Sequence, residues 1–279
     1  MRVITREKTT VAGDYKDIEY FPIYQPSRRR LPRRSGCKES SAAQKELNRK
    51  NAERRLFYLI AENFTGKDRH VTLEYAGKGN ISIAQCEKDI ENFIRRIRYI
   101  YIKIGAELKY LAVIEVGEER GRLHHHIIMS GLTASQLAAA LPAEKYPELY
   151  KYGEVPSFED FIYYIWGKGF ANADRLRQND NYEGLAKYLS KAPKGKRRYK
   201  FSRNLTRFYR NAEIHDNRTS KRTLQSLILH EADREYYMKL YPGFEPIKIE
   251  IKKNEYIKGN YIFIRLRRIG ADAPPTLCS

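Results

Sequence analysis

The sequence predicts an α+β fold in which helices lie on one face of a mostly antiparallel β-sheet, and three observations lead to this prediction. Residues 69–75 (RHVTLEY) alternate apolar and polar side chains, as a half-buried strand does. Residues 82–104 repeat apolar side chains at spacings of three and four, which is typical of a helix packed on a sheet. Residues 108–116 and 123–129 are apolar and β-branched on either side of a polar turn, as in a β-hairpin.

The chain is also strongly basic and rich in aromatic residues. Its 279 residues include 53 Lys and Arg against 34 Asp and Glu, which gives a formal net charge of +19. It contains 22 Tyr and 11 Phe, whose rings can stack on unpaired bases. Because such a field attracts polyanions, nucleic acid is the expected partner. An anionic membrane surface is the alternative, but no basic amphipathic helix stands out.

Hydropathy and cysteine content indicate the compartment. No apolar run reaches the roughly 18–20 residues that span a bilayer, and the first residues, MRVITREKTT, lack the apolar stretch of a secretory signal. Cys37, Cys86 and Cys278 are scattered and odd in number, which argues against a disulfide framework and against a cysteine zinc site. We therefore expect a protein of the reducing cytoplasm that does not insert into membranes.

Residues 1–62 are expected to form a basic N-terminal arm followed by a helix. The run SRRRLPRRSG at 27–36 has few aliphatic residues, so it reads either as a flexible arm that contacts phosphates or as a solvated tail, with equal weight. Residues 44–62 have a helical pattern.

The clearest single element is the helix expected at 82–104. Ser82 with Gln85 three residues later has the spacing of a capping box, and Gly105 follows as a stop signal. Its apolar stripe predicts that one side packs against the sheet.

The hairpin at 108–129 carries the first group of chemically interesting residues. Because strand side chains alternate between faces, His124 and His126 point one way and His125 the other. Any register that pairs 116 with 123 also places Glu115 opposite His124 and Val113 opposite His126.

Two imidazoles with a facing carboxylate suit Mg²⁺, Mn²⁺ or Zn²⁺, with positions left for water and phosphate. A one-residue slip would remove Glu115 from this face and leave Glu118 or Glu119, in the turn, as the carboxylate ligand. The plainer interpretation is a half-buried strand whose histidines pair with carbonyl groups or lie on the surface.

The remaining elements complete the predicted sheet. A short helix is expected at 133–141, an apolar helix at 157–166 and a further strand at 169–176. The resulting β-α-β-β-α-β order predicts a ferredoxin-like, or RRM-like, antiparallel sheet core with helices on one face, to which N- and C-terminal extensions are added.

A further helix is expected at 182–191, where Pro193 ends it, and it carries a candidate nucleophile. At about 100° per residue, Gly184, Tyr188 and Lys191 share one face of this helix. A phenol can attack phosphorus while a nearby ammonium group stabilises the oxygens. Among 22 tyrosines, the more common role of any single one is packing or stacking.

Taken together, these motifs resemble the HUH endonuclease superfamily, in particular the rolling-circle replication initiators of small phages and related integrated elements. The likeness covers residues 45–205 and rests on four segments. These are NFTGKDRHVTLEY at 63–75, VIE followed by GRLHHH within 113–126, AKYLSK at 186–191 and RRYKFSRNL at 197–205.

The resemblance implies nicking of single-stranded or extruded origin DNA in a bacterial host cell. It implies that His124, His126 and Glu115 bind Mg²⁺ or Mn²⁺, that Tyr188 joins covalently to the 5′ phosphate, and that a 3′ hydroxyl is freed to prime replication. Lys191 and Lys187 would assist Tyr188. The DNA-binding residues that it suggests are Lys187, Arg197, Arg198 and Arg203.

Two positions depart from the family pattern. The residue between the paired histidines is usually bulky and apolar, and here His125 needs a polar partner in the core or shifts the ligand assignment by one. Some phage initiators carry a second tyrosine one turn earlier, where this chain has Gly184, and Tyr182 lies on another face of the helix. A single nucleophile is therefore expected.

The expected organisation is an arm and helix at 1–62, a nuclease domain at 63–205 and an accessory extension at 206–279 that ends in a hairpin at 247–268. No GxxxxGK[ST] motif occurs, so unwinding would need a host helicase and synthesis a host polymerase. The oligomeric state stays open. Two alternatives remain: a conjugative relaxase or single-strand transposase with the same chemistry, and a non-catalytic nucleic-acid-binding module of the same fold.

Overall fold

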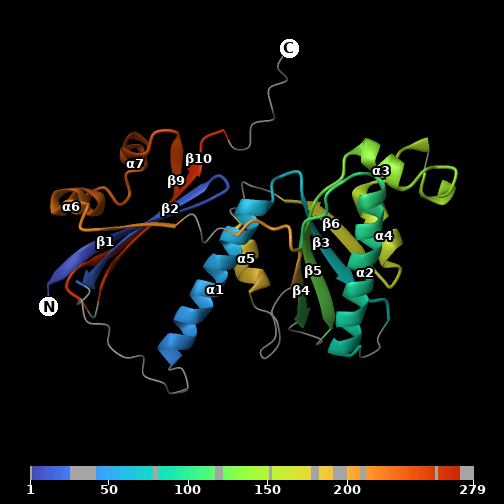
Figure 1. Cartoon of the computed structure of the whole chain (residues 1–279), viewed down its shortest axis with the longest axis horizontal. Coiled ribbons are helices and arrows are strands. Elements are labelled where there is room, and N and C mark those ends of the chain that lie inside the picture. Colours follow the sequence, from blue (N-terminus) through green and yellow to red (C-terminus); the bar gives the residue numbers. More distant parts are fainter. Residues whose placement is uncertain are drawn as a thin grey trace, which may run out of the picture. The chain divides into compact units, whose positions relative to one another are not determined.

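The computed structural model shows an α+β protein with two antiparallel sheets, which confirms the predicted fold class (Figure 1). The chain forms two compact units, one of Arg49–Thr206 and one of Met1–Asn48 with Arg207–Ser279. The structure describes residues 2–25, 42–77, 81–116, 122–150, 153–176, 182–190, 200–207, 212–254 and 257–270.

The Arg49–Thr206 unit contains the predicted sheet. Its strand order is β6-β3-β5-β4-β7, and each neighbouring pair is antiparallel. The first four of these strands in the chain, with a helical segment in each of the two crossovers, have the β-α-β-β-α-β arrangement of a ferredoxin-like core. The strands are β3 (Arg69–Glu74), β4 (Tyr110–Val116), β5 (Leu123–Met129), β6 (Ala171–Arg175) and β7 (Lys200–Phe201).

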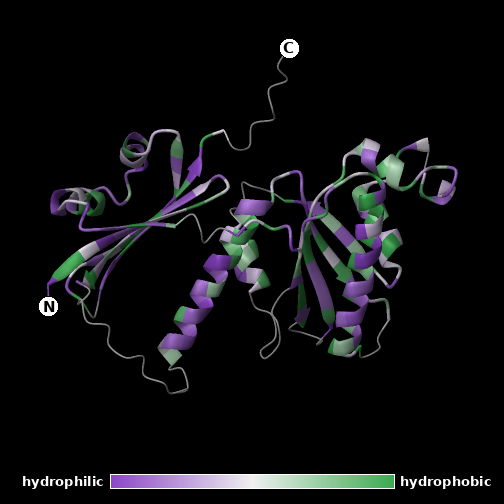
Figure 2. Ribbon diagram, in the orientation of Figure 1, coloured by the Kyte–Doolittle hydropathy of each residue, from purple (hydrophilic) through white to green (hydrophobic). Residues whose placement is uncertain are grey.

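Helices α2 (Ile83–Lys103) and α4 (Phe158–Trp166) cover one face of this sheet (Figure 1). The Ser82 hydroxyl accepts the amide hydrogen of Gln85 and so starts α2, as the sequence predicts. The apolar stripe of α2 packs against the strands and against α4, and the shorter α3 (Ala134–Ala140) and a 3₁₀ turn (Pro147–Leu149) lie between β5 and α4 in the chain. Figure 2 shows this mixture of apolar and polar residues along α2.

Helices α1 (Ala42–Asn63) and α5 (Glu183–Leu189) lie on the other side of the same sheet in Figure 1. Both ends of α5 are fixed to the α1 segment. The Tyr182 hydroxyl donates to the Phe64 carbonyl over 3.4 Å, and the Ser190 hydroxyl donates to Glu53 over 3.3 Å. These bonds orient a helix of only seven residues, which would not be stable alone.

The second unit differs from the sequence-based division of the chain. Residues expected to form a separate N-terminal arm and a separate C-terminal extension instead share one sheet, with strand order β8-β1-β2-β10-β9. Helices α6 (Lys221–Leu229) and α7 (Arg234–Leu240) pack on it. The strands are β1 (Val3–Ala12), β2 (Tyr15–Tyr24), β8 (Ala212–Asp216), β9 (Phe244–Lys253) and β10 (Asn260–Arg268).

The physical reason for this difference is the distance in sequence between the paired strands. Strand β2 pairs with β10, where Ile18 lies opposite Ile264, and such a partner leaves no local signal in either segment. The hairpin expected at 247–268 is confirmed as β9 and β10. The basic run at 27–36 lies outside the described residues. In the described ranges, no helix combines the length and the apolar character required to cross a membrane.

Candidate active site

The β4–β5 hairpin has the register that places Glu115 on the histidine face. Val116 pairs with Leu123, Glu115 with His124 and Val113 with His126, as predicted. Directly opposed residues share a face of the sheet, so Glu115, His124 and His126 lie together. The alternative carboxylates of the turn, Glu118 and Glu119, are outside the described residues.

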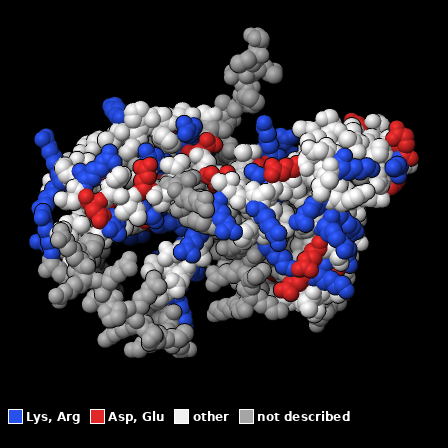
Figure 3. Space-filling view, viewed as in Figure 1, with Lys and Arg blue, Asp and Glu red and all other residues white. Residues whose placement is uncertain are grey.

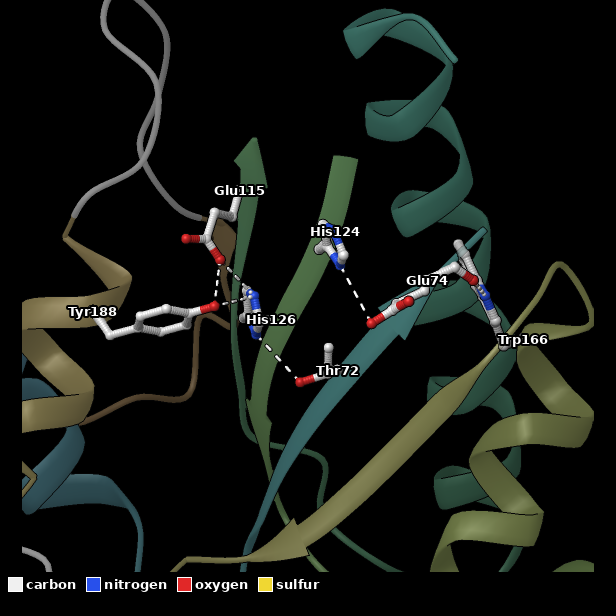
Figure 4. A network of polar contacts seen from close by, with 7 residues as sticks. All are labelled: Thr72, Glu74, Glu115, His124, His126, Trp166 and Tyr188. Carbon is white, nitrogen blue, oxygen red and sulfur yellow. Dashed lines mark hydrogen bonds and ion pairs between the residues drawn. The ribbon is translucent and has the colours of Figure 1, made fainter. Parts of the chain in front are cut away.

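Strand β3 adds two polar side chains to the same face (Figure 4). Glu74 lies opposite His124, with 3.5 Å between Glu74 Oε1 and His124 Nδ1. Thr72 lies opposite His126, with 3.3 Å between Thr72 Oγ1 and His126 Nδ1. The sequence does not reveal these contacts, because β3 and β5 are separated by a helix and another strand.

Helix α5 directs Tyr188 at this face (Figure 4). The Tyr188 hydroxyl donates to Glu115 Oε2 over 2.5 Å and lies 3.1 Å from His126 Nε2, which is itself 2.8 Å from Glu115 Oε2. The Tyr188 ring meets the His126 ring edge-on, with 5.0 Å between centroids. Tyr188 is 38% exposed, so a polymer on the surface can reach its hydroxyl.

Burial keeps the imidazole of His126 neutral. It lowers the pKa of His126 below its ordinary value, although the neighbouring Glu115 carboxylate acts in the opposite direction. The neutral ring fits a proton on Nε2 that is donated to Glu115 and a lone pair on Nδ1 that accepts from Thr72. A hydroxyl can donate or accept, so Thr72 also allows the other tautomer, whose Nε2 lone pair is free for a cation.

The donor chemistry of this face fits a divalent cation. Imidazoles from His124 and His126 and carboxylates from Glu115 and Glu74 supply the nitrogen and oxygen ligands that Mn²⁺, Mg²⁺ and Zn²⁺ accept. The side chains as they stand in the described residues do not form a group of three or more that encloses a metal position. His124 is turned to Glu74 and His126 to Glu115.

His125 lies on the opposite face of β5, away from Glu115 and Tyr188. It is completely buried, and its Nε2 is 2.9 Å from the Tyr75 hydroxyl, which donates to Asp89 on α2 over 3.2 Å. The core therefore supplies the polar partner that an imidazole in this position needs. Its Nδ1 has no hydrogen-bond partner among the described residues, and burial lowers the pKa of His125 to about 4.

The other sequence candidates divide into two groups. Lys187 on α5 and Arg203 after β7 are exposed, and Arg203 lines a groove of about 710 Å³ with Arg98 and Phe201. Lys191, Arg197 and Arg198 lie outside the described residues.

Two positions of α5 bear on the number of nucleophiles. Tyr182 is 3% exposed and structural, and Gly184 is an exposed position of the helix. Among the described residues of α5, Tyr188 is therefore the tyrosine that reaches the Glu115 and His126 pair.

The described surface of the Arg49–Thr206 unit carries many basic side chains. In Figure 3, Lys and Arg outnumber Asp and Glu on the visible face of this unit. A surface of this charge fits a polyanionic partner.

One comparison with known proteins gives a match. The family model of the replication-associated protein ORF2 matches residues 68–193. This range contains β3, β4, β5 and α5, and therefore every residue of the Tyr188 cluster. No significant match is found among curated proteins or among solved structures.

Proposed function

We propose that this protein initiates DNA replication by cutting one strand of an origin, with Tyr188 as the nucleophile and a 5′-phosphotyrosine as the intermediate. The enzyme class is a divalent-cation-dependent DNA endonuclease that also transfers strands. Its substrate is single-stranded or extruded DNA, and a host polymerase would extend the freed 3′ end after a host helicase opens the duplex.

The observation that carries this proposal is the position of the Tyr188 hydroxyl. It donates a 2.5 Å hydrogen bond to Glu115 and lies 3.1 Å from His126, although the tyrosine is 73 and 62 residues away from them in the chain. A phenol that contacts a carboxylate and an imidazole has the base next to the nucleophile that covalent catalysis requires. A tyrosine that served only in packing would not need this contact.

The chemistry follows from these atoms. The Tyr188 oxygen bonds to phosphorus as the phenolic proton passes to Glu115, and the bond from phosphorus to the 3′ oxygen breaks. The departing 3′ oxygen takes up a proton, so a free 3′ hydroxyl and a tyrosine phosphodiester result. A bound divalent cation would offset the charge on the phosphate oxygens, and His124, His126, Glu115 and Glu74 would hold it. Because the phosphodiester link is retained, the reverse reaction can rejoin a strand.

Two further observations support the proposal. The match to the family model of the replication-associated protein ORF2 spans the whole cluster, and the net charge of +19 favours a polyanionic substrate. A relaxase or a single-strand transposase would use the same chemistry on another DNA sequence. A binding module without catalysis would bind the DNA but form no covalent product.

The test is incubation of the protein with circular single-stranded DNA and Mn²⁺, with and without a chelator, followed by denaturing electrophoresis and peptide mapping. We expect an adduct on Tyr188 that depends on the metal. Tyr188→Phe should bind DNA normally and form none. Tyr182→Phe is the matched control, because it removes a hydroxyl from the start of the same helix without touching Glu115 or His126.

DNA binding without an adduct under any divalent metal would favour the binding module. An adduct that persists in Tyr188→Phe would assign the nucleophile to another residue.

A further inference from the structure

Phe170 is an apolar ring presented to solvent next to the site. It is 71% exposed, although it directly precedes strand β6 at the edge of the sheet that carries the site. Among the described residues it stacks on no other aromatic ring, and its side chain belongs to neither hydrophobic core. An exposed phenylalanine is costly in water, so a reason other than packing is needed for its position.

The sheet register places Phe170 beside the candidate cation ligands. Strand β3 pairs with β6 so that Leu73 lies opposite Ala171, and the Glu74 amide donates to the Phe170 carbonyl over 2.9 Å. The register thus continues to a pair of Glu74 and Phe170, whose Cβ atoms are about 4.5–5.5 Å apart in such pairs. Because side chains alternate, the Phe170 ring lies on the face of Glu74 and His124.

The backbone at this position is held firmly. The Ala76 amide donates to the Lys168 carbonyl over 2.8 Å, and the Trp166 indole donates to the Glu74 carbonyl over 2.8 Å. Gly169 sits so close to β3 that an added Cβ would be 2.2 Å from the Glu74 carbonyl oxygen. The ring of Phe170 is therefore mounted on a fixed frame and does not belong to a loose loop tip.

We propose that Phe170 is a stacking platform for an unpaired base of the DNA strand, beside the phosphate that Tyr188 attacks. This inference rests on the proposed function and adds a base-binding subsite to it. An aromatic face binds any base by stacking, which suits a strand that must be held in place while one phosphate is cut. Arg122, two residues before His124 and exposed, lies on the same side of β5 and can contact a neighbouring phosphate.

The matched control is Tyr99, which has the same exposed fraction of 71%. Tyr99 belongs to α2, the helix that covers the opposite face of the sheet. Removal of either ring deletes a similar exposed aromatic group, but of the two only Phe170 lies on the Tyr188 face.

The experiment measures fluorescence anisotropy of a labelled single-stranded oligothymidine with the full-length protein and a chelator, so that no cutting occurs. We expect Phe170→Ala to weaken binding about 5-fold to 100-fold, the usual range for loss of one stacked base. Phe170→Tyr should restore affinity and Tyr99→Ala should stay within about 2-fold of wild type. The salt dependence of Phe170→Ala should be unchanged, because no charge is lost.

Two other readouts separate stacking from a structural effect. Phe170→Trp should show quenching of its indole emission on addition of the oligonucleotide, with the buried Trp166 as a constant background. Double-stranded DNA of the same length should be bound equally by Phe170→Ala and wild type, because its bases are not available for stacking.

Wild-type affinity of Phe170→Ala for the single strand would overturn the platform, as would equal losses in Phe170→Ala and Tyr99→Ala. The two proposals fail separately. Loss of single-strand binding in Phe170→Ala with no Tyr188 adduct in the wild type would leave a binding surface and remove the nuclease. A Tyr188 adduct with unchanged binding by Phe170→Ala would leave the nuclease and remove the subsite.

Discussion

At the residue scale, one carboxylate oxygen links the candidate nucleophile to the imidazole. Glu115 Oε2 accepts from Tyr188 and is also hydrogen bonded to His126. The parity argument from the hairpin anticipates the pairing of Glu115 with His124, because a strand and its nearest neighbour are set by a short turn. The contacts of Glu74 and Thr72 depend on a strand joined through a long crossover, so local spacing could not supply them.

Binding of a cation should depend on the two histidines of one face and not on the histidine between them. We expect His124→Ala combined with His126→Ala to weaken Mn²⁺ binding at least about 10-fold in isothermal titration calorimetry, because both imidazole ligands are lost. His125→Leu is the control, since His125 lies in the core on the other face. Equal loss of Mn²⁺ affinity in His125→Leu would move the ligand assignment by one residue.

The buried imidazoles should make stability depend on pH. Burial lowers the pKa of both His70 and His125 to about 4, whereas an unfolded histidine titrates at about 6.5. Between these values the unfolded chain binds protons that the folded chain does not. The free energy of unfolding should therefore fall as the pH falls through this window, by up to about 1.4 kcal/mol per pH unit for the fully buried His125.

Urea unfolding at several pH values between these two pKa values measures this slope. His125→Leu should show a shallower slope than wild type, because one of the two titrating groups is removed. A wild-type slope in His125→Leu would mean that the imidazole is protonated or solvated in the folded protein.

At the element scale, local patterns account for the sheet of the Arg49–Thr206 unit and its helices. The strand at 69–75, the helix at 82–104 and the hairpin are found with small shifts at their ends, since each has a strong period and a clear stop signal. Strands β1 and β2 are not predicted because their charged residues hide the alternation, although Gly13 and Asp14 form a two-residue turn. The Tyr188 helix is short, and tertiary bonds orient it.

Gly184 tests how far the stability of α5 limits the protein. An added Cβ at this position meets no atom within 4 Å, so Gly184→Ala should stabilise the protein by about 0.5–1 kcal/mol through the lower entropy of the unfolded chain. Urea unfolding measures the change. Gly169→Ala should have the opposite sign, because its Cβ would collide with the β3 backbone. Destabilisation by Gly184→Ala would show that α5 needs a glycine conformation.

At the scale of the whole molecule, the order of the chain divides the second unit. Its sheet is built from the first and the last described segments, whereas the sheet that carries Glu115 and His126 is continuous within Arg49–Thr206. Composition predicts a basic nucleic-acid-binding protein, but it cannot reveal that β2 and β10 pair, because long-range pairing is decided by the cores that both strands bury. The consequence is that the two terminal segments depend on each other.

Truncation should show this dependence. Removal of residues 207–279 takes away β8, β9 and β10 and exposes Ile18 and Tyr20, which are 2% and 6% exposed in the intact protein. We expect this variant to bind a hydrophobic dye and to aggregate in size-exclusion chromatography. The matched variant that lacks both residues 1–48 and residues 207–279 should remain monodisperse, because it leaves no half-sheet behind. If the first truncation were as well behaved as the second, the β1–β2 hairpin would be stable without its partners, which isolated hairpins rarely are.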